Sequence, residues 1–440
     1  MKTFYAFLLC FFSLFCIQSQ TKTEVLLKEG EVFLLNQQYD KALTSFNKVI
    51  ALLPADADAY YNRAVTYANM NKFDSAVTDY TTTLKLNPKK IEAYINRGSA
   101  YSELREYTLA IKDYNKAIEL NPKMAEAYNN RGYLLSLQNL HPDAIKDFDK
   151  AIALHPKYSK AYINKAYSLS ILGNHQASVE VLSQLIAVQP DMAPAYFNRA
   201  VEYKELKDIK NALKNYDKGL QLEPDDIKSL FQRAELRDES GDDLGAIEDC
   251  SKIIRVNPSN AIAYYARARA KYDLPDYSAV AEDCSNAIQL KPDYWEAYVL
   301  RGNAFDFLNK YEDALKDYNK AIELNPKATE AYDQRAVARL SKNDVTGALS
   351  DLSKAILIAP SNIQLIGKRA ILRSATKDIT GAIDDYSKLI MLAPDNAKAF
   401  LARAELYSNI GNNEQACEDY KHAEALGSGM AVSKRIFYCK

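Results

Sequence analysis

The sequence predicts an all-α protein, a solenoid of helix-turn-helix repeats that ends in a capping helix. Eleven of the fourteen prolines follow one another at intervals of 34 residues, from Pro54 to Pro394. A fixed period of this length is typical of repeat architectures. Small residues and aromatic residues recur in the same frame, so every repeat is expected to share one internal packing.

Residues 1–19, which precede the repeats, have the pattern of a secretory signal peptide. An apolar run from Phe4 to Ile17 follows the single basic residue Lys2. The run is shorter than the ~20 apolar residues that span a bilayer, and it has the length of a signal-peptide core. The sequence therefore predicts an exported protein, periplasmic or secreted, that is not inserted in the membrane after cleavage.

Cleavage is expected between Ser19 and Gln20, and two alternatives stay open. The weakly basic start also fits a short anchor that is never cleaved. Cys10 and Cys16 raise the possibility of a lipoprotein, although a bulky residue precedes each of them where a lipidation signal has a small one.

Twelve repeats are predicted to fill residues 23–430. They start at residues 23, 57, 91, 125, 159, 193, 227, 261, 295, 329, 363 and 397. The eighth residue is glycine or alanine in all twelve repeats, and the twentieth is alanine in ten. Two small faces let two antiparallel helices approach closely, and the mostly aromatic fourth and twenty-fourth residues are expected to fill the space between helices.

Each repeat is predicted to form a helix, a short inner turn, a second helix and an outer turn marked by proline. Proline donates no backbone hydrogen bond and disfavours the helical region for the residue before it. Gly173, Gly241 and Gly411 mark inner turns. The last repeat lacks the proline, and a capping helix is expected at 430–440, where it would cover the exposed end of the array.

This pattern resembles the tetratricopeptide repeat. A clear copy is formed by Tyr94, Gly98, Tyr101, Ala110, Tyr114, Ala117 and Pro122. The resemblance covers roughly residues 23–430. It implies a right-handed superhelix in which the first helix of each repeat lines a concave groove.

Charged residues also recur in the frame. The seventh residue is arginine in ten repeats and the twenty-third is aspartate in nine. We predict an Arg–Asp pair between the two helices of each repeat, the alternative being two unpaired, solvated rows. A buried pair of this kind would fix the register of the helices more than it would stabilise them.

No catalytic or metal-binding constellation appears in the sequence. Phosphate-binding glycine loops and the nucleophile and zinc motifs are absent. His141 and His175 occupy equivalent turns and are expected to be exposed, because two imidazoles without neighbouring ligands make a poor metal site. We therefore predict no enzyme and no cofactor, and the balance of 56 basic against 57 acidic residues predicts no nucleic-acid partner.

Four cysteines follow the predicted signal peptide. Cys250 and Cys284 occupy the twenty-fourth position of neighbouring repeats, too far apart for a disulfide, and are expected to be buried thiols. Cys417 could reach Cys439 across the capping helix, and the sequence leaves open whether these two form a disulfide.

The second, fifth, sixth, ninth, twelfth and thirteenth residues of each repeat are expected to line the groove. The sixth is asparagine in five successive repeats, at Asn62, Asn96, Asn130, Asn164 and Asn198. A side-chain amide can pair with the N–H and the C=O of a peptide backbone together. The row resembles the asparagine ladder in the repeat domain of O-linked N-acetylglucosamine transferases, and the alternative is a solvated helix face.

Two further sets of groove residues complete the predicted site. Apolar anchors are expected to bind at Tyr61, Tyr133, Tyr167 and Phe197. Basic partners are expected at Glu205, Glu235, Asp238, Glu239, Asp273 and Asp306. The leading hypothesis is a protein–protein interaction scaffold that binds an extended peptide or a partner protein in the groove. The alternative is a structural or assembly component of a cell-envelope complex that binds through its convex face or edges.

Overall fold

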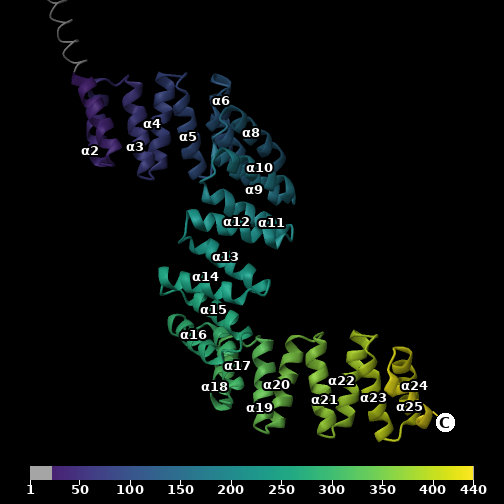
Figure 1. Cartoon of the computed structure of the whole chain (residues 1–440). Helices are drawn as coiled ribbons and strands as arrows, with labels where there is room; N and C mark the ends of the chain where they lie inside the picture. Colours follow the sequence, from purple (N-terminus) through teal and green to yellow (C-terminus); the bar gives the residue numbers. More distant parts are fainter. Residues whose placement is uncertain (1–21, 440) are drawn as a thin grey trace, which may run out of the picture. The chain divides into compact units, whose positions relative to one another are not determined.

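The computed structural model describes residues 22–439, and every regular element in that range is an α-helix. The chain divides into two units, Met1–Pro224 and Asp225–Lys440. Within each unit, consecutive helices lie side by side in chain order (Figure 1). The all-α prediction is confirmed, whereas the predicted signal peptide lies outside the described residues.

The first unit begins with a helix over 22–35. It continues with α2 (Tyr39–Leu52), α3 (Ala57–Asn69), α4 (Phe73–Leu86), α5 (Ile91–Glu103), α6 (Tyr107–Leu120), α7 (Ala125–Leu137), α8 (His141–Leu154), α9 (Ser159–Ile171), α10 (His175–Val188), α11 (Ala193–Glu205) and α12 (Ile209–Leu222).

The second unit has the same alternation of helices. Its elements are α13 (Ile227–Glu239), α14 (Asp243–Val256), α15 (Ala261–Asp273), α16 (Tyr277–Leu290), α17 (Trp295–Phe307), α18 (Tyr311–Leu324), α19 (Thr329–Ser341), α20 (Val345–Ile358), α21 (Ile363–Ala375), α22 (Ile379–Leu392), α23 (Ala397–Asn409), α24 (Asn413–Ala425) and α25 (Gly429–Tyr438).

The inner turn of a repeat closes its first helix with a left-handed residue. Asn71 has φ of 58°; its N–H donates to the carbonyl of Ala68, and the N–H of Lys72 donates to that of Tyr67. These are the two hydrogen bonds of a Schellman cap. Asparagine and glycine tolerate positive φ better than other residues, and Gly173 takes φ of 75° at the equivalent point, as its position in the sequence predicts.

The outer turn ends the second helix just before proline. Asn121, which precedes Pro122, has φ of −142° and ψ of 96°, and Asn325 before Pro326 has φ of −133° and ψ of 91°. Both lie in the extended region that a following proline favours. The proline period of the sequence therefore sets the length of each second helix.

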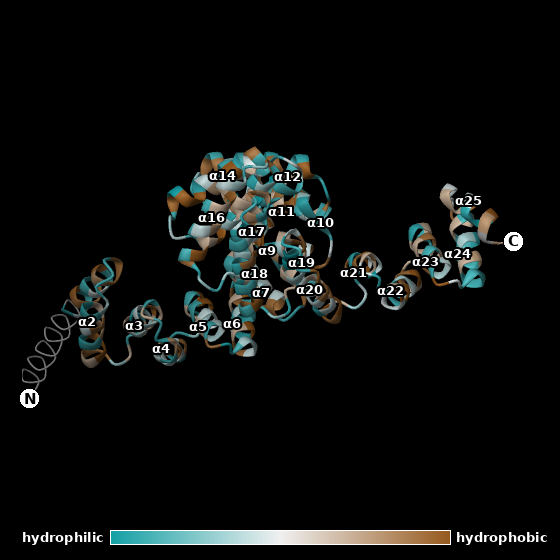
Figure 2. Ribbon diagram, turned by 90° about the horizontal axis from the view of Figure 1, so that it is seen from below, coloured by the Kyte–Doolittle hydropathy of each residue, from teal (hydrophilic) through white to brown (hydrophobic). Residues whose placement is uncertain are grey.

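Small residues allow the two helices of a repeat to touch. A Cβ atom added to Gly98 would lie 2.7 Å from Cε1 of Tyr114, and one added to Gly302 would lie 2.6 Å from Cε1 of Tyr318. Both tyrosines are buried. Each aromatic ring therefore occupies the space that the small residue leaves. Figure 2 shows that individual helices carry both polar and apolar residues.

The predicted Arg–Asp pairs are confirmed. In each pair Nε and Nη2 of arginine donate to the two carboxylate oxygens of aspartate at 2.5–2.9 Å. The pairs are Arg63–Asp79, Arg97–Asp113, Arg131–Asp147, Arg233–Asp249, Arg267–Asp283, Arg301–Asp317, Arg335–Asp351, Arg369–Asp385 and Arg403–Asp419. The aspartates are buried, so a bidentate geometry and full pairing compensate for their desolvation.

The same arginines also reach the preceding repeat. Nη1 of Arg97 donates to Oγ1 of Thr81 at 3.0 Å, and the guanidinium lies 5.8 Å from the ring centre of Tyr94. Nη1 of Arg301 likewise donates to Oγ of Ser285 at 3.0 Å. One side chain thus links the two helices of its own repeat to the second helix of the repeat before it.

Three repeats depart from this arrangement, and the first of them has Glu29 and Ser45 in place of the pair. The other two keep part of it. In one, Asn215 replaces aspartate and accepts from Nε of Arg199 at 2.9 Å. In the other, Lys165 replaces arginine, and its ammonium pairs with Asp149 of the preceding repeat at 2.6 Å. The link between repeats is therefore kept even where the pair within a repeat is lost.

The helix α25 packs on α24 at the C-terminal end, as the predicted capping helix requires. Cys417 and Cys439 form a disulfide, which the sequence left open. Cys250 and Cys284 are free and buried, as predicted. Among the described helices, none is both long enough and apolar enough to cross a membrane.

We expect Asp317→Ala to destabilise the second unit much more than Asp317→Asn. Alanine leaves the guanidinium of Arg301 without its carboxylate, a loss of about 3–5 kcal/mol for a buried pair. Asparagine can still accept from Nε, as Asn215 does, and about 1–2 kcal/mol is expected. Urea unfolding of the two variants measures the difference, and equal midpoints would contradict it.

Replacing Cys417 and Cys439 by serine together should loosen α25. The disulfide closes a loop of 22 residues, for which chain entropy gives about 3 kcal/mol. Hydrogen exchange of the α25 amides should accelerate, while amides of α21 and α22 serve as the internal control. Unchanged protection of α25 would show that packing on α24 suffices to hold it.

Candidate functional site

The five asparagines predicted to form a ladder lie on five successive first helices of the first unit. Each is the sixth residue of its repeat and is half-buried. They are Asn62 on α3, Asn96 on α5, Asn130 on α7, Asn164 on α9 and Asn198 on α11. They occupy equivalent places in the fold, and their binding of a peptide stays a prediction.

Three of these amides donate a hydrogen bond to the preceding repeat. The bonds run from Nδ2 of Asn62 to Glu31 (3.0 Å), of Asn96 to the Tyr61 hydroxyl (2.9 Å) and of Asn164 to Oδ1 of Asn129 (3.1 Å). Sequence reasoning missed these contacts, although a separation of 35 residues could have suggested two of them. An amide has two N–H donors and one carbonyl acceptor, so each of these bonds uses one donor and leaves polar groups of the amide, of which Asn96 uses one more toward Tyr80.

The predicted aromatic anchors differ in exposure. Tyr133 and Tyr167 are 47% and 58% exposed and can contact a ligand. Tyr61 is half-buried, with its ring centre 5.9 Å from that of Tyr80. These three rings stand beside the asparagine row in the first unit.

Phe197 requires a correction, since it is only 8% exposed and cannot serve as an open anchor. Its ring occupies the space over Gly219 on α12, where an added Cβ would lie 2.2 Å from its Cε1. Six of the twelve repeats have alanine at this position of the second helix, and the others except this one have a larger residue. The missing methyl group of Gly219 therefore lets the Phe197 ring turn into the core.

The predicted acidic residues belong to both units. Glu205 is exposed at the end of α11 in the first unit. In the second unit, Glu235 and Glu239 are exposed on α13, whereas Asp238 on the same helix is half-buried. Asp306 on α17 is also half-buried.

The hydroxyl of Tyr318 donates to Asp306 at 2.7 Å. Burial raises the pKa of Asp306 above its usual range, against the effect of that hydrogen bond. This carboxyl group is therefore part of the interior of its repeat as well as of the predicted groove.

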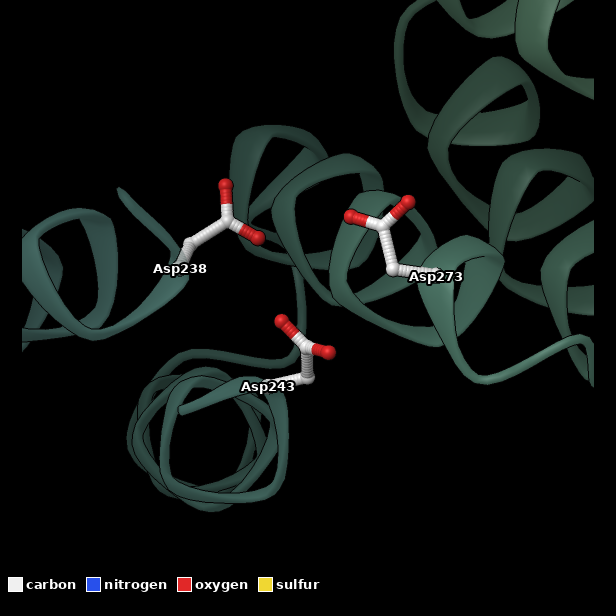
Figure 3. A group of neighbouring side chains, drawn as sticks. All are labelled: Asp238, Asp243 and Asp273. Carbon is white, nitrogen blue, oxygen red and sulfur yellow. The ribbon is translucent and has the colours of Figure 1, made fainter. Parts of the chain in front are cut away.

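Three carboxylates of the second unit gather at one place. Asp238, Asp243 and Asp273 each place one oxygen within 4.8 Å of the others, and they point toward one another from α13, α14 and α15 (Figure 3). Nη2 of Arg269 donates to Oδ2 of Asp238 at 2.6 Å. Asp243 was not predicted as a site residue because it starts a second helix rather than lying on a first one.

Burial raises the pKa of Asp238 above its usual range. Arg269 opposes the shift, while Asp273 and Asp243 add to it. The group is thus an acidic centre with one bound guanidinium, able to attract a further cation.

An apolar cavity of about 260 Å³ opens beside this acidic group. It is lined by the buried Cys250, Ala234 and Ala246 and by the half-buried rings of Phe231 and Tyr265. Gln232, Glu235, Asp238, Ile262, Ala266, Arg269 and Tyr294 complete the lining. Most of these side chains occupy predicted groove positions, but the sequence alone gave no sign of a cavity.

The histidines also require a correction. His141 is 5% exposed as the first residue of α8, with Nδ1 3.5 Å from Oγ of Ser136. His175 is half-buried, and its Nδ1 lies 2.8 Å from Oε2 of the buried Glu202. They were expected to be exposed turn residues, whereas both begin second helices that pack on their neighbours.

The two free thiols are poorly suited to nucleophilic chemistry. Burial raises the pKa of Cys250 to about 12 and also raises that of Cys284. Since the thiolate is the reactive form of cysteine, both behave as small apolar side chains of the interior at neutral pH.

Antiparallel helix pairs with a constant interior and variable first-helix residues define the class of helical-repeat scaffolds. Tetratricopeptide repeat models match residues 57–90, 91–124, 125–158, 193–226 and 295–328, and further models of that description match 148–180 and 397–426. A TPR repeat model matches 30–71. Together these matches cover more than half of the chain, and the protein belongs to the tetratricopeptide repeat family.

Members of this family are protein–protein interaction scaffolds, generally without enzymatic activity, and this chain is such a scaffold. No curated protein matches the chain. Solved structures similar to it include yeast Tom70, with 17% identity over 96% of this chain and 94% of that one, at a TM-score of 0.41.

Two bacterial structures are also similar. The C-terminal part of a TPR repeat-containing protein from Cytophaga hutchinsonii is 20% identical over 55% of this chain and 98% of its own, with a TM-score of 0.46. A tetratricopeptide repeat protein from Parabacteroides merdae is 22% identical over 57% of this chain and 99% of its own, with a TM-score of 0.44.

We expect Asp273→Asn to lower the pKa of Asp238, because the exposed Asp273 carboxylate disfavours ionisation of its neighbour. A carboxyl group with a raised pKa contributes stability below its ordinary pKa, and that contribution is lost as pH rises through the raised value. The variant should therefore gain on the order of 0.5 kcal/mol at neutral pH, and the gain should vanish in acid.

Carbon-13 NMR titration of the carboxyl groups and urea unfolding at two pH values measure these effects. Asp395→Asn, at an exposed aspartate of another repeat, is the control and should change neither. A pKa of Asp238 that is the same in Asp273→Asn and the parent protein would refute the coupling.

Proposed function

We propose that the protein is an exported scaffold that binds an extended peptide along the first helices of its first unit. The observation that carries this proposal is the row of half-buried asparagines at equivalent positions of α3, α5, α7, α9 and α11. Tyr133 and Tyr167 are exposed beside the row. Amides can pair with a peptide backbone of any sequence, and the rings supply apolar contacts.

The dimensions of the repeat fit an extended peptide. Neighbouring helices lie ~10 Å apart, and an extended chain advances ~3.3 Å per residue. One amide therefore meets about every third residue of the ligand. The bonds between repeats orient the amides before binding, so less side-chain entropy is lost when the peptide arrives.

Export is the second part of the proposal. Its support is the apolar run from Phe4 to Ile17 in the sequence and the disulfide between Cys417 and Cys439. Structural disulfides persist mainly in oxidising compartments. A periplasmic or secreted location accounts for both features, and N-terminal sequencing of the exported protein should find Gln20 as the first residue.

A role as a structural or assembly component is the alternative. Met430 and Ile436 are 69% and 63% exposed on α25, so the C-terminal edge offers apolar surface to a partner. In that case the edge rather than the asparagine row carries binding.

A large array of twelve-residue peptides of random sequence separates the two proposals. The double variant Asn62→Ala, Asn96→Ala should bind the peptides that the parent protein binds with about ten-fold lower affinity, the effect of roughly one net hydrogen bond. These two positions are chosen because Asn130 and Asn164 both contact the buried Asn129, whose amide needs its partners.

Asn174→Ala is the matched control, since Asn174 is exposed and its side chain caps no helix. It should bind as the parent protein does. Binding that survives the double substitution but is lost with Met430→Ser and Ile436→Ser would favour the edge. Circular dichroism of every variant confirms that the helices are retained.

A further inference from the structure

The cavity between α13, α14 and α15 lies where two positions of the repeat both carry small residues. In the first unit, the ring at the twenty-fourth position of one repeat lies beside the amide at the sixth position of the next, as Tyr80 does with Asn96 and Tyr114 with Asn130. At the equivalent point of α14 and α15 the two residues are Cys250 and Ala266. Both line the cavity of about 260 Å³.

The next repeat shows that the cavity is not a general consequence of a cysteine. Cys284 also replaces the aromatic residue, but the sixth position of the following repeat is Leu300, which packs in one buried cluster with Cys284. The larger leucine therefore fills the volume that the ring would have taken. At Cys250 and Ala266 both side chains are small, and both line the cavity. The cavity lined by Tyr386 and Ala402 keeps a large residue at one of these two positions.

The lining of the cavity favours an apolar side chain as its occupant. A buried thiol, the methyl groups of Ala234 and Ala246 and the rings of Phe231 and Tyr265 line it. Apolar surface predominates in the lining, so an aliphatic or aromatic side chain that enters the cavity gains from leaving solvent. The rings of Tyr265 and Tyr294, 4.9 Å apart, give the occupant a π-surface to contact.

The charge at the rim of the cavity favours a basic residue next to the apolar side chain that enters it. The carboxylates of Asp238, Asp243 and Asp273 lie together (Figure 3), and one guanidinium, that of Arg269, is bound to them. Three negative charges against one positive charge favour a further cation at this edge. An apolar residue followed closely by lysine or arginine satisfies both parts of the surface.

We propose that the cavity between α13, α14 and α15 binds one Leu, Met or Phe side chain of a partner peptide that carries Lys or Arg beside it. This inference rests on the proposed peptide-binding function and adds a specificity determinant to it. The asparagine row recognises backbone, while the cavity recognises one side chain and its charge context.

Fluorescence anisotropy with labelled peptides tests the proposal. The probes have the form Gly-Ser-Gly-Ser-X-Lys-Lys-Gly-Ser, with Leu, Met, Phe, Ala or Asp at X, and a second series has Glu-Glu after X. The parent protein should bind the Leu, Met and Phe peptides about 10–100-fold more tightly than the Ala and Asp peptides, the range expected for burying an apolar side chain. The Glu-Glu series should bind more weakly throughout.

Cys250→Tyr restores the residue found at Tyr216 and Tyr318 and should fill the cavity. It should bind the Leu, Met and Phe peptides no better than the Ala peptide. Cys250→Ser is the matched control, because it keeps the volume open and should keep the preference. Ala266→Leu copies the arrangement at Leu300 and fills the space from the opposite helix, so the test holds even if the tyrosine is not accommodated.

Each outcome of these binding measurements either supports or overturns the inference. Equal affinity of the Leu and Asp peptides for the parent protein, including undetectable binding of both, overturns the inference, as does an unchanged preference in the two cavity-filling variants. Loss of the preference in those variants supports it. If the preference is absent while Asn62→Ala with Asn96→Ala still weakens array peptides, only the cavity inference fails and the proposed function stands.

Discussion

The arginine at the seventh position of the repeat is the interaction on which the rest of the structure depends. In Arg97, Nε and Nη2 bind Asp113 at 2.7 Å, Nη1 reaches Thr81 of the preceding repeat, and the plane of the guanidinium lies over Tyr94. A planar group with five fixed donors is suited to such a junction, whereas a lysine ammonium is not. The substitution at Lys165 accordingly keeps one of these contacts, the one to Asp149.

This junction helps the array to hold its register where the helices meet through small residues. Alanines and glycines let the helices approach, and apolar burial between them is correspondingly limited. A buried Arg–Asp pair contributes little net free energy, but any shift of one helix along another would leave two charges buried and unpaired. The pairs thus specify the register, because a shifted helix would bury charges without partners. Contacts between neighbouring repeats extend this register along the array.

Because the junction engages the seventh, twenty-third and twenty-fifth residues, the sixth, ninth and twelfth residues of the first helices can vary. The interior was therefore predictable from the sequence. The period, the small faces, the Arg–Asp pairs and the buried thiols each come from residues that recur at the same position of successive repeats. The predictions that failed concern contacts between different positions. Phe197 is buried because Gly219, on another helix, lacks a methyl group, and His141 is buried at the start of α8 beside Ser136 of α7.

The same distinction explains why the acidic group and the cavity could not be predicted. Asp243 joins Asp238 and Asp273 only because three helices converge, and no single row of the repeat contains all three. Cys250 and Ala266 each have a counterpart elsewhere: Cys284 replaces the aromatic residue in the next repeat, and Ala402 stands at the sixth position of the last repeat. Their combination matters because the ring at one position and the side chain 16 residues later share one volume, which Leu300 fills in the following repeat. At Leu300 a larger residue compensates for the smaller cysteine and the interior stays filled, whereas Cys250 and Ala266 leave the loss uncompensated at the cavity for which we propose an apolar side chain as occupant.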